Sequence, residues 1–288
     1  MIKIGDICPL FLNPLKYEYA NMGSYRQCFD TTDDIILQVF CDNGEVPTGT
    51  INDKINSTVT NIKFTKYNVN DKVVMYYSSF RPSEGIYTVT VAGKESEEFE
   101  MCDNAKGILI EYTHKDNNSV FDNIFWNGDK QTVFKYRIPG GFKPSGVSIE
   151  VDNEQFVNQR QEIIELYAIP YTTRVFSIGD VNGVPYYAAE LINKILCLSS
   201  VKIGGDYYIR ESNSKPDVVE AIGKKELFMY SVTLRPSENT IAGIGGKIEE
   251  SVSASGASFA LKNPNDGEVL VYSENENAFV NTNNLSSL

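Results

Sequence analysis

The residue best suited to acid–base chemistry in this sequence is its single histidine, His114. A Ser-His-Asp or Cys-His triad requires a histidine, so any such site in this chain would have to include His114. His114 stands at the end of an expected strand, next to Lys115, and the chain contains no GxSxG nucleophile turn. We therefore interpret His114 as an ordinary surface or strand-end residue and expect no catalytic residues and no enzymatic activity.

Paired carboxylates are the other candidates for chemistry, and they occur at Asp33-Asp34, Glu97-Glu98 and Glu249-Glu250. A glycosidase needs two carboxylates roughly 5–10 Å apart across a cleft, which neighbouring residues alone do not establish. Acidic doublets in such an acidic chain are more typical of solvated turns and strand edges. Residues 103–118 contain three acids without the spacing or glycine of a calcium loop, so we expect no metal ion and no cofactor.

The single tryptophan, Trp126, lies in FDNIFWNGD (121–129), between polar turn residues. A tryptophan in such a loop can stack on a sugar ring or take part in a protein interface. It can also fill the end of a β-sandwich, and we favour this second interpretation. Trp126 is nevertheless the candidate contact residue for a carbohydrate-binding function.

Composition and charge exclude several classes of partner. The chain has 26 basic and 38 acidic residues and a net charge of -12, so we expect no nucleic-acid partner. No segment approaches about 20 uninterrupted apolar residues, so we expect no membrane partner. Lys3, Asp6 and Pro9 interrupt any apolar signal segment, which predicts synthesis in the cytoplasm. The five cysteines show no metal-ligand spacing and are expected to be reduced thiols.

The first 140 residues contain short runs in which apolar and polar residues alternate, as in β-strands. These runs are 33–40, 57–69, 72–80, 85–93, 97–101, 107–114 and 131–138. Strands of this length and spacing are typical of a sandwich, and no useful helical periodicity precedes residue 150. We therefore predict a β-sandwich-like domain over residues 1–140.

Proline and glycine are dense in IPGGFKPSG (138–146), where we predict a domain boundary. The following domain, residues 141–238, is predicted to be α+β. Its clearest element is a helix over 184–200, because apolar residues recur there at helical spacing.

Strands are expected on both sides of this helix. They are 161–171, which also has a competing helical interpretation, 174–180, the hairpin 201–210 with Gly204-Gly205 in its turn, and 226–235. The predicted domain is therefore a small sheet that carries one packed helix.

The last part of the chain, residues 239–288, is predicted to be a flexible linker followed by a hairpin and a tail. The Ser/Gly/Ala-rich stretch 249–258 is the linker, and NDGEVLVYSENENAFVN (265–281) predicts two short strands around a polar turn. A lone hairpin is marginally stable in water, so this one must pack on its own chain or on another. The expected fold class is thus mainly β: a sandwich, an α+β domain and a C-terminal hairpin.

Two long segments carry a resemblance to a known family. They are EFEMCDN…ILIEYTHKDNNSVFDNIFW…VFKYRIPGGF (98–142) and FVNQRQEIIELYAIPYTTRVFSIGDVNGVPYYAAELINKILCLSSVKIGGDYYIR (156–210). Both resemble uncharacterised structural proteins, associated with the tail or baseplate, of phages and prophages of Bacteroidales gut bacteria. DGEVLVY followed by Phe279, Val280 and Asn281 is similar to short segments of phage tail-fibre proteins, although Phe279 stands where tryptophan is common.

The resemblance implies a non-enzymatic virion protein of a phage or prophage tail, baseplate or neck. Such a protein is made in the bacterial cytoplasm, is incorporated in the virion, and has other virion proteins and further copies of itself as partners. The terminal hairpin, with Tyr272 and Phe279 as its candidate contact residues, is then expected to dock on a neighbouring subunit by strand addition. The alternative function is a carbohydrate-binding module of a phage adsorption apparatus.

Overall fold

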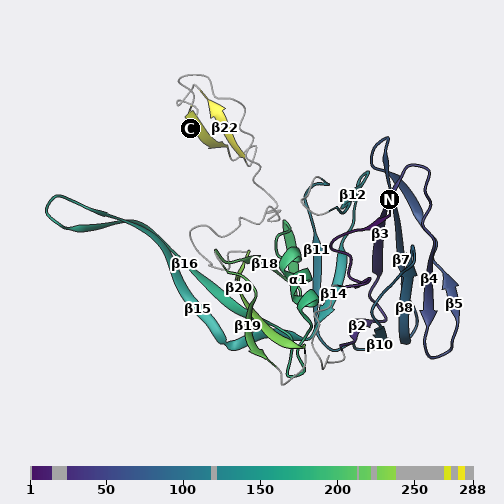
Figure 1. Ribbon diagram of the computed structural model, residues 1–288. Coiled ribbons are helices and arrows are strands. Elements are labelled where there is room, and N and C mark those ends of the chain that lie inside the picture. Colours follow the sequence, from purple (N-terminus) through teal and green to yellow (C-terminus); the bar gives the residue numbers. More distant parts are fainter. Residues whose placement is uncertain are drawn as a thin grey trace. The chain divides into compact units, whose positions relative to one another are not determined.

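The computed structural model describes residues 2–14, 25–117, 122–212, 214–221, 226–237, 269–273 and 278–282 (Figure 1). The chain forms two compact units, Met1–Glu238 and Asn239–Leu288. Over the described residues the fold is mainly β with a single helix, so the predicted fold class is confirmed. None of these residues belongs to a helix long and apolar enough to span a membrane.

The N-terminal part of the first unit is a β-sandwich of two sheets. One sheet has the order β1 (Lys3–Ile4), β3 (Ile35–Asp42), β7 (Val73–Phe80), β6 (Thr65–Asn68). The other has the order β2 (Gln27–Asp30), β10 (Phe99–Cys102), β8 (Gly85–Val91), β4 (Gly49–Asp53), β5 (Val59–Asn61), with β9 (Lys94–Glu95) beside β8. Alternate residues of β3, such as Leu37 and Val39, are buried with Val89 and Phe99 of the facing sheet. This burial is the physical basis of the alternating sequence pattern.

A third, larger sheet follows the two sheets of the sandwich. Its order is β14 (Phe134–Ile138), β11 (Ile108–Thr113), β17 (Ser200–Ile203), β18 (Asp206–Arg210), β20 (Phe228–Pro236), β16 (Ile163–Ile178), β15 (Gly140–Val157), with β19 (Asp217–Ala221) beside β20. The short pair β12 (Trp126–Asn127) and β13 (Lys130–Gln131) stands apart from it.

Strands β11 and β14 lie within the range predicted for the first domain, but they pair in this larger sheet. Strand β11 hydrogen-bonds to β14 on one side and to β17 on the other. The alternation of a strand indicates which of its faces is buried but not which sheet it joins, because partners far apart in sequence decide that. The division into domains near residue 140 stays a prediction.

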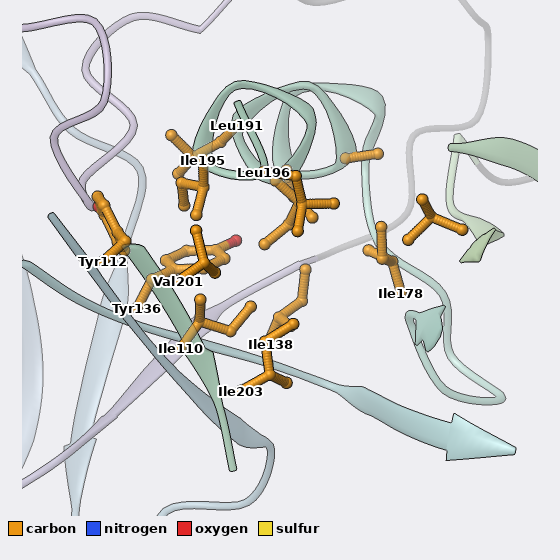
Figure 2. Packing of buried hydrophobic residues seen from close by; sticks show 14 of the residues in the cluster. Ile110, Tyr112, Tyr136, Ile138, Ile178, Leu191, Ile195, Leu196, Val201 and Ile203 are labelled. Carbon is orange, nitrogen blue, oxygen red and sulfur yellow. The ribbon is translucent and has the colours of Figure 1, made fainter. Parts of the chain in front are cut away.

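Helix α1 (Tyr186–Ile195) packs on the larger sheet and closes its core. Figure 2 shows Leu191, Ile195 and Leu196 of this segment above Ile110 and Val201 of the sheet. The helix is shorter than the predicted 184–200. It tightens at its end, where the Cys197 and Leu198 N–H groups donate to carbonyls three residues back, and β17 begins at residue 200.

Two strand predictions need correction. The runs 161–171 and 174–180 are parts of the single strand β16, so the helical interpretation of 161–171 was wrong. The run 57–69 is divided into β5 and β6, which belong to different sheets of the sandwich. The predicted hairpin at 201–210 is confirmed as β17 and β18.

The second unit contains the predicted C-terminal hairpin. Strands β21 (Val269–Ser273) and β22 (Ala278–Thr282) are antiparallel, and Tyr272 lies opposite Phe279 in their register. The predicted linker 249–258 and the residues after 282 lie outside the described residues.

Candidate interaction surface

The most prominent feature of the first unit is the ribbon formed by β15 and β16. The two strands pair from Gly140–Ile178 at the base to Val157–Ile163 at the tip. A third strand, β20, pairs with β16 only from Arg174 to Ile178. Beyond Arg174 the ribbon therefore has two strands, and Figure 1 shows it extending away from the rest of the sheet. We call residues 147–173 the outer arm.

The outer arm exposes many large apolar side chains. The exposed fraction of Ile149 is 84% and that of Ile163 is 67%. The full set is Val147, Ile149, Val151, Phe156, Val157, Ile163, Ile164, Leu166, Tyr167 and Ile169. Single exposed apolar residues are ordinary, but a contiguous group of this size is typical of an interaction site.

Three of these apolar residues, Val147, Ile149 and Val151, lie on one face of the ribbon, whereas Tyr167 and Ile169 lie on the other face, opposite Glu154 and Asp152. Residues directly opposite each other in an antiparallel pair project to the same face, and faces alternate along each strand. Val151 lies opposite Pro170, and Val147 and Ile149 share its face through this alternation. We call this side the apolar face.

The opposite side carries Glu150, Asp152 and Glu154, and we call it the acidic face. The Tyr171 hydroxyl donates to Glu150 Oε2 at 2.9 Å, and the Thr173 hydroxyl donates to Oε1 at 3.0 Å. These two hydrogen bonds lower the pKa of Glu150 and keep it charged. The negative charge of Asp152 raises the pKa of Tyr167, so that tyrosine adds no charge of its own to the acidic face.

The base of the arm is firmly packed. Phe142 lies against Phe176 and Tyr208, with ring centroids 5.2 and 4.6 Å apart. Gly140 has a φ of +135°, and a Cβ at this position would lie 2.1 Å from the Ser177 carbonyl oxygen. At the level of Tyr171 the ribbon is held by Arg235, whose guanidinium lies 3.9 Å from the ring centroid. The arm therefore projects from a well-ordered support.

Sequence reasoning missed this arm. The signal was present in VSIEVD (147–152), where apolar and polar residues alternate strictly, and in the polar turn NQRQ (158–161). The adjacent proline and glycine residues were interpreted as a domain boundary. Alternation usually indicates a half-buried strand, but here the side chains of both faces are mostly exposed among the residues that the structure describes.

Trp126 lies in β12 and is half-buried. Its indole Nε1–H donates to the His114 carbonyl at 3.0 Å, and its backbone N–H donates to Asn117 Oδ1 at 2.7 Å. Its side chain packs against the core of the larger sheet. The tryptophan thus has internal partners that hold its turn in place.

Among the described residues, no side-chain hydroxyl or thiol forms a hydrogen bond with the His114 imidazole. Its Nδ1 accepts the backbone N–H of Ser199 at 3.1 Å, and its ring packs near Phe125. The Ser199 hydroxyl accepts the Lys115 N–H at 2.8 Å. These contacts describe a structural histidine at the end of β11, and they bring together no triad.

The acidic doublets are not all solvated as expected. Asp33 is 1% exposed and forms an ion pair with Arg137, whose Nε lies 2.5 Å from Oδ2. Its neighbour Asp34 pairs with Arg81 at 2.9 Å on the surface. A buried charge needs such a partner, which sequence position alone did not indicate. The doublet at 249–250 lies outside the described residues.

Other concave sites offer little chemistry. A cleft of about 350 Å³ lies between the N-terminal segment and α1. On its wall Lys3 pairs with Asp6 at 3.5 Å and Lys194 pairs with Glu190 at 3.6 Å, so these charges offset one another. The described part of the chain contains no group of three or more His, Cys, Asp or Glu residues that could hold a metal ion.

Comparisons with known proteins give no family. No protein-family model and no curated protein matches the chain. A solved structure entitled "Crystal structure of Dpr2 Ig1-Ig2 in complex with DIP-Theta Ig1-Ig3" aligns with 79% of this chain and 92% of that chain, at 8% identity. Its TM-score is 0.16, which is too low to support an argument about fold or function.

Proposed function

We propose that this chain is a non-enzymatic structural protein that assembles through its outer arm, as a component of a phage or prophage tail, baseplate or neck. The observation that supports assembly most directly is the two-stranded ribbon with its exposed apolar face. The resemblance of residues 98–142 and 156–210 to phage structural proteins supports the placement in a virion. The expected partners are other virion proteins and further copies of this chain.

The energetics of the outer arm favour a bound state. A two-stranded ribbon is marginally stable alone in water, and its outer edges present unpaired N–H and C=O groups. Burial of a side chain such as Ile149 or Val151 contributes about 1.5–3 kcal/mol when it is complete. A partner that covers the apolar face and pairs with one edge would therefore stabilise the arm and gain affinity from it.

The test is an arm-shortened variant in which residues 150–171 are replaced by Asn-Gly. Because Ile149 lies opposite Thr172, a two-residue turn can close the shortened ribbon. We expect the intact chain to form discrete assemblies in sedimentation and negative-stain images, and the variant to be monomeric with an unchanged unfolding midpoint. An intact chain that stays monomeric at every concentration, or a variant that assembles like it, would contradict the proposal.

The C-terminal hairpin is proposed as a second contact. The Tyr272–Phe279 pair in its register gives it two aromatic residues at one cross-strand position. Removal of residues 259–288 is expected to weaken assembly without changing the fold of the first unit. Unchanged assembly after this deletion would eliminate the hairpin from the interface.

Carbohydrate binding through Trp126 is the competing proposal. The half-exposed indole could still offer part of its ring to a sugar. A glycan array, probed with the intact chain and with Trp126→Phe, separates the two functions. Binding that depends on the indole would favour an adsorption module over a purely structural role.

A further inference from the structure

The outer arm and one edge of the sandwich have complementary surfaces. The arm contains five acids, Glu150, Asp152, Glu154, Glu162 and Glu165, against one base, Arg160. Such an excess of one sign next to an apolar face selects a partner that is basic and partly apolar. The chain itself carries a surface of this kind.

That surface is the edge of the sandwich formed by residues 55–72, which we call the basic edge. Strands β5 and β6 are the terminal strands of their two sheets, and among the described residues each has a pairing partner on one side only. All three residues of β5 are exposed, and the exposed fractions of Ile55 and Val59 are 63% and 66%. The basic edge therefore offers open strand edges and apolar area together.

Its charge is the reverse of that of the arm. Lys63, Lys66 and Lys72 are exposed, and none pairs with a carboxylate within the described part of the chain. Asp71 is the only acid between residues 55 and 72. In an otherwise acidic chain, this group of unpaired lysines stands out as a site for a negatively charged partner.

Direct pairing between two arms is disfavoured by the same charges. If the β15 edges of two copies paired with their apolar faces aligned, their acidic faces would also align. Glu150, Asp152 and Glu154 would then lie opposite like charges, which destabilises a sheet. The β16 edge is interrupted by Pro170, which has no N–H to donate.

We propose that the outer arm of one copy docks on the basic edge of a second copy. This inference rests on the proposed assembly function and names its partner. The contact joins two different surfaces, so each copy can bind one neighbour through its arm and a second neighbour through its basic edge. Repetition of this contact produces a ring or a filament. The carboxylates of the acidic face lie near Lys63, Lys66 and Lys72 of the neighbour.

The experiment uses two variants that each lose one half of the contact. The first is the arm-shortened variant, and the second carries Lys63→Glu, Lys66→Glu and Lys72→Glu. A control carries Lys106→Glu, Lys115→Glu and Lys130→Glu, three exposed lysines elsewhere that change the net charge equally. Molecular masses are measured by sedimentation and mass photometry.

We expect each of the two variants to be monomeric alone and the control to assemble like the intact chain. Mixed together, the two variants should form a heterodimer with one copy of each. One contact remains possible, between the arm of the lysine variant and the basic edge of the arm-shortened variant. If the lysine variant assembles normally while the arm-shortened variant does not, the basic edge is not the surface that binds the arm. The proposed function, assembly through the arm, would still hold in that case. Absence of the heterodimer also overturns the inference, and absence of any assembly overturns the proposed function as well.

A different observation carries a second inference. Cys28 and Cys102 lie on the neighbouring parallel strands β2 and β10, and their Sγ atoms are 2.8 Å apart. Cys28 is opposite Glu100 in the register, so Cys102 is on the same face of the sheet, two residues along. Both thiols are half-buried on the face away from the sandwich core.

We propose that Cys28 and Cys102 form a disulfide when the folded protein meets oxidised glutathione. One protein thiolate attacks the glutathione disulfide and releases one reduced glutathione. The second protein thiol then displaces the other, so two thiols are oxidised and one glutathione disulfide is reduced, with both protons passing to the leaving glutathione thiolates.

Burial raises the pKa of Cys28 to about 12, so this exchange is slow at neutral pH and accelerates as pH rises. The test uses a Cys197→Ser background, which removes the exposed thiol. After exposure to oxidised glutathione we expect a mass loss of two hydrogen atoms and a linked Cys28–Cys102 peptide. The same treatment of a Cys28→Ser chain should give no internal disulfide. Retention of all free thiols in alkaline oxidised glutathione, or a disulfide between other cysteines, would overturn this inference.

Discussion

Gly140 is the residue on which the base of the arm depends most directly. Its φ of +135° is a conformation that side-chain-bearing residues rarely adopt, and a Cβ added there would clash with the Ser177 carbonyl oxygen. We expect Gly140→Ala to lower the free energy of unfolding by about 1–3 kcal/mol. Urea unfolding measures this, with Gly44→Ala as the control because Gly44 has φ +101° but open space around it. Equal losses in both variants would show that the close contact with Ser177 is unimportant.

Asp30 offers a pH-dependent prediction at the same scale. Hydrogen bonds from the Thr32 hydroxyl and N–H and from the Ala105 N–H lower its pKa to about 2. Because the pKa is lower in the folded state, its stabilisation is complete above the unfolded-state value of about 3.9 and is lost as pH falls toward 2. Asp30→Asn should therefore destabilise the chain at pH 7 and have little effect near pH 2. Thermal unfolding at several pH values checks this, and a pH-independent loss would refute it.

The sequence predicted some residue environments and missed others. His114 lies directly after β11, at the strand end where the sequence placed it. Asp33 was interpreted as solvated, although it is buried against Arg137. The arginine is far away in sequence, and only the pairing of distant elements brings the two charges together.

At the scale of elements, helix α1 was the most predictable feature. Its apolar residues at helical spacing face the sheet, as Figure 2 shows for Leu191 and Ile195. Truncation of the buried Ile195 to alanine should lower the free energy of unfolding by about 2–5 kcal/mol. Glu190→Ala, on the exposed side of the helix, should change it by only about 0.5 kcal/mol. Chemical denaturation of both variants measures the difference, and a small effect at Ile195 would mean that the helix is not anchored there.

Strands were easier to locate than to assign to sheets. The alternation in 107–114 predicted β11 correctly, yet nothing local indicates that this strand pairs with β17. The arm shows the opposite problem. Its residues 147–152 alternate as in a half-buried strand, yet they are mostly exposed in the described part of the chain. A sequence pattern records which residues favour burial, whereas the partner that buries them can be another molecule.

At the scale of the whole molecule, the uneven distribution of charge gives a test of how copies associate. Salt screens exposed charges, with a Debye length of about 10 Å at 0.1 M. If acidic arms dock on basic edges, assembly should weaken as ionic strength rises from about 0.05 to 0.5 M. Sedimentation at several salt concentrations measures this. Stronger assembly in high salt would indicate contact between like-charged arms instead.

The length of the outer arm has a mechanical consequence. Eleven residues from Val147 to Val157, at about 3.3 Å each, span roughly 35 Å. A neighbour bound along such a ribbon is held at a distance from the larger sheet, and only two strands connect the bound surface to that sheet. The arm would therefore act as a tether between neighbouring copies. A ring or filament linked by such tethers can change its curvature while each copy keeps the same neighbours.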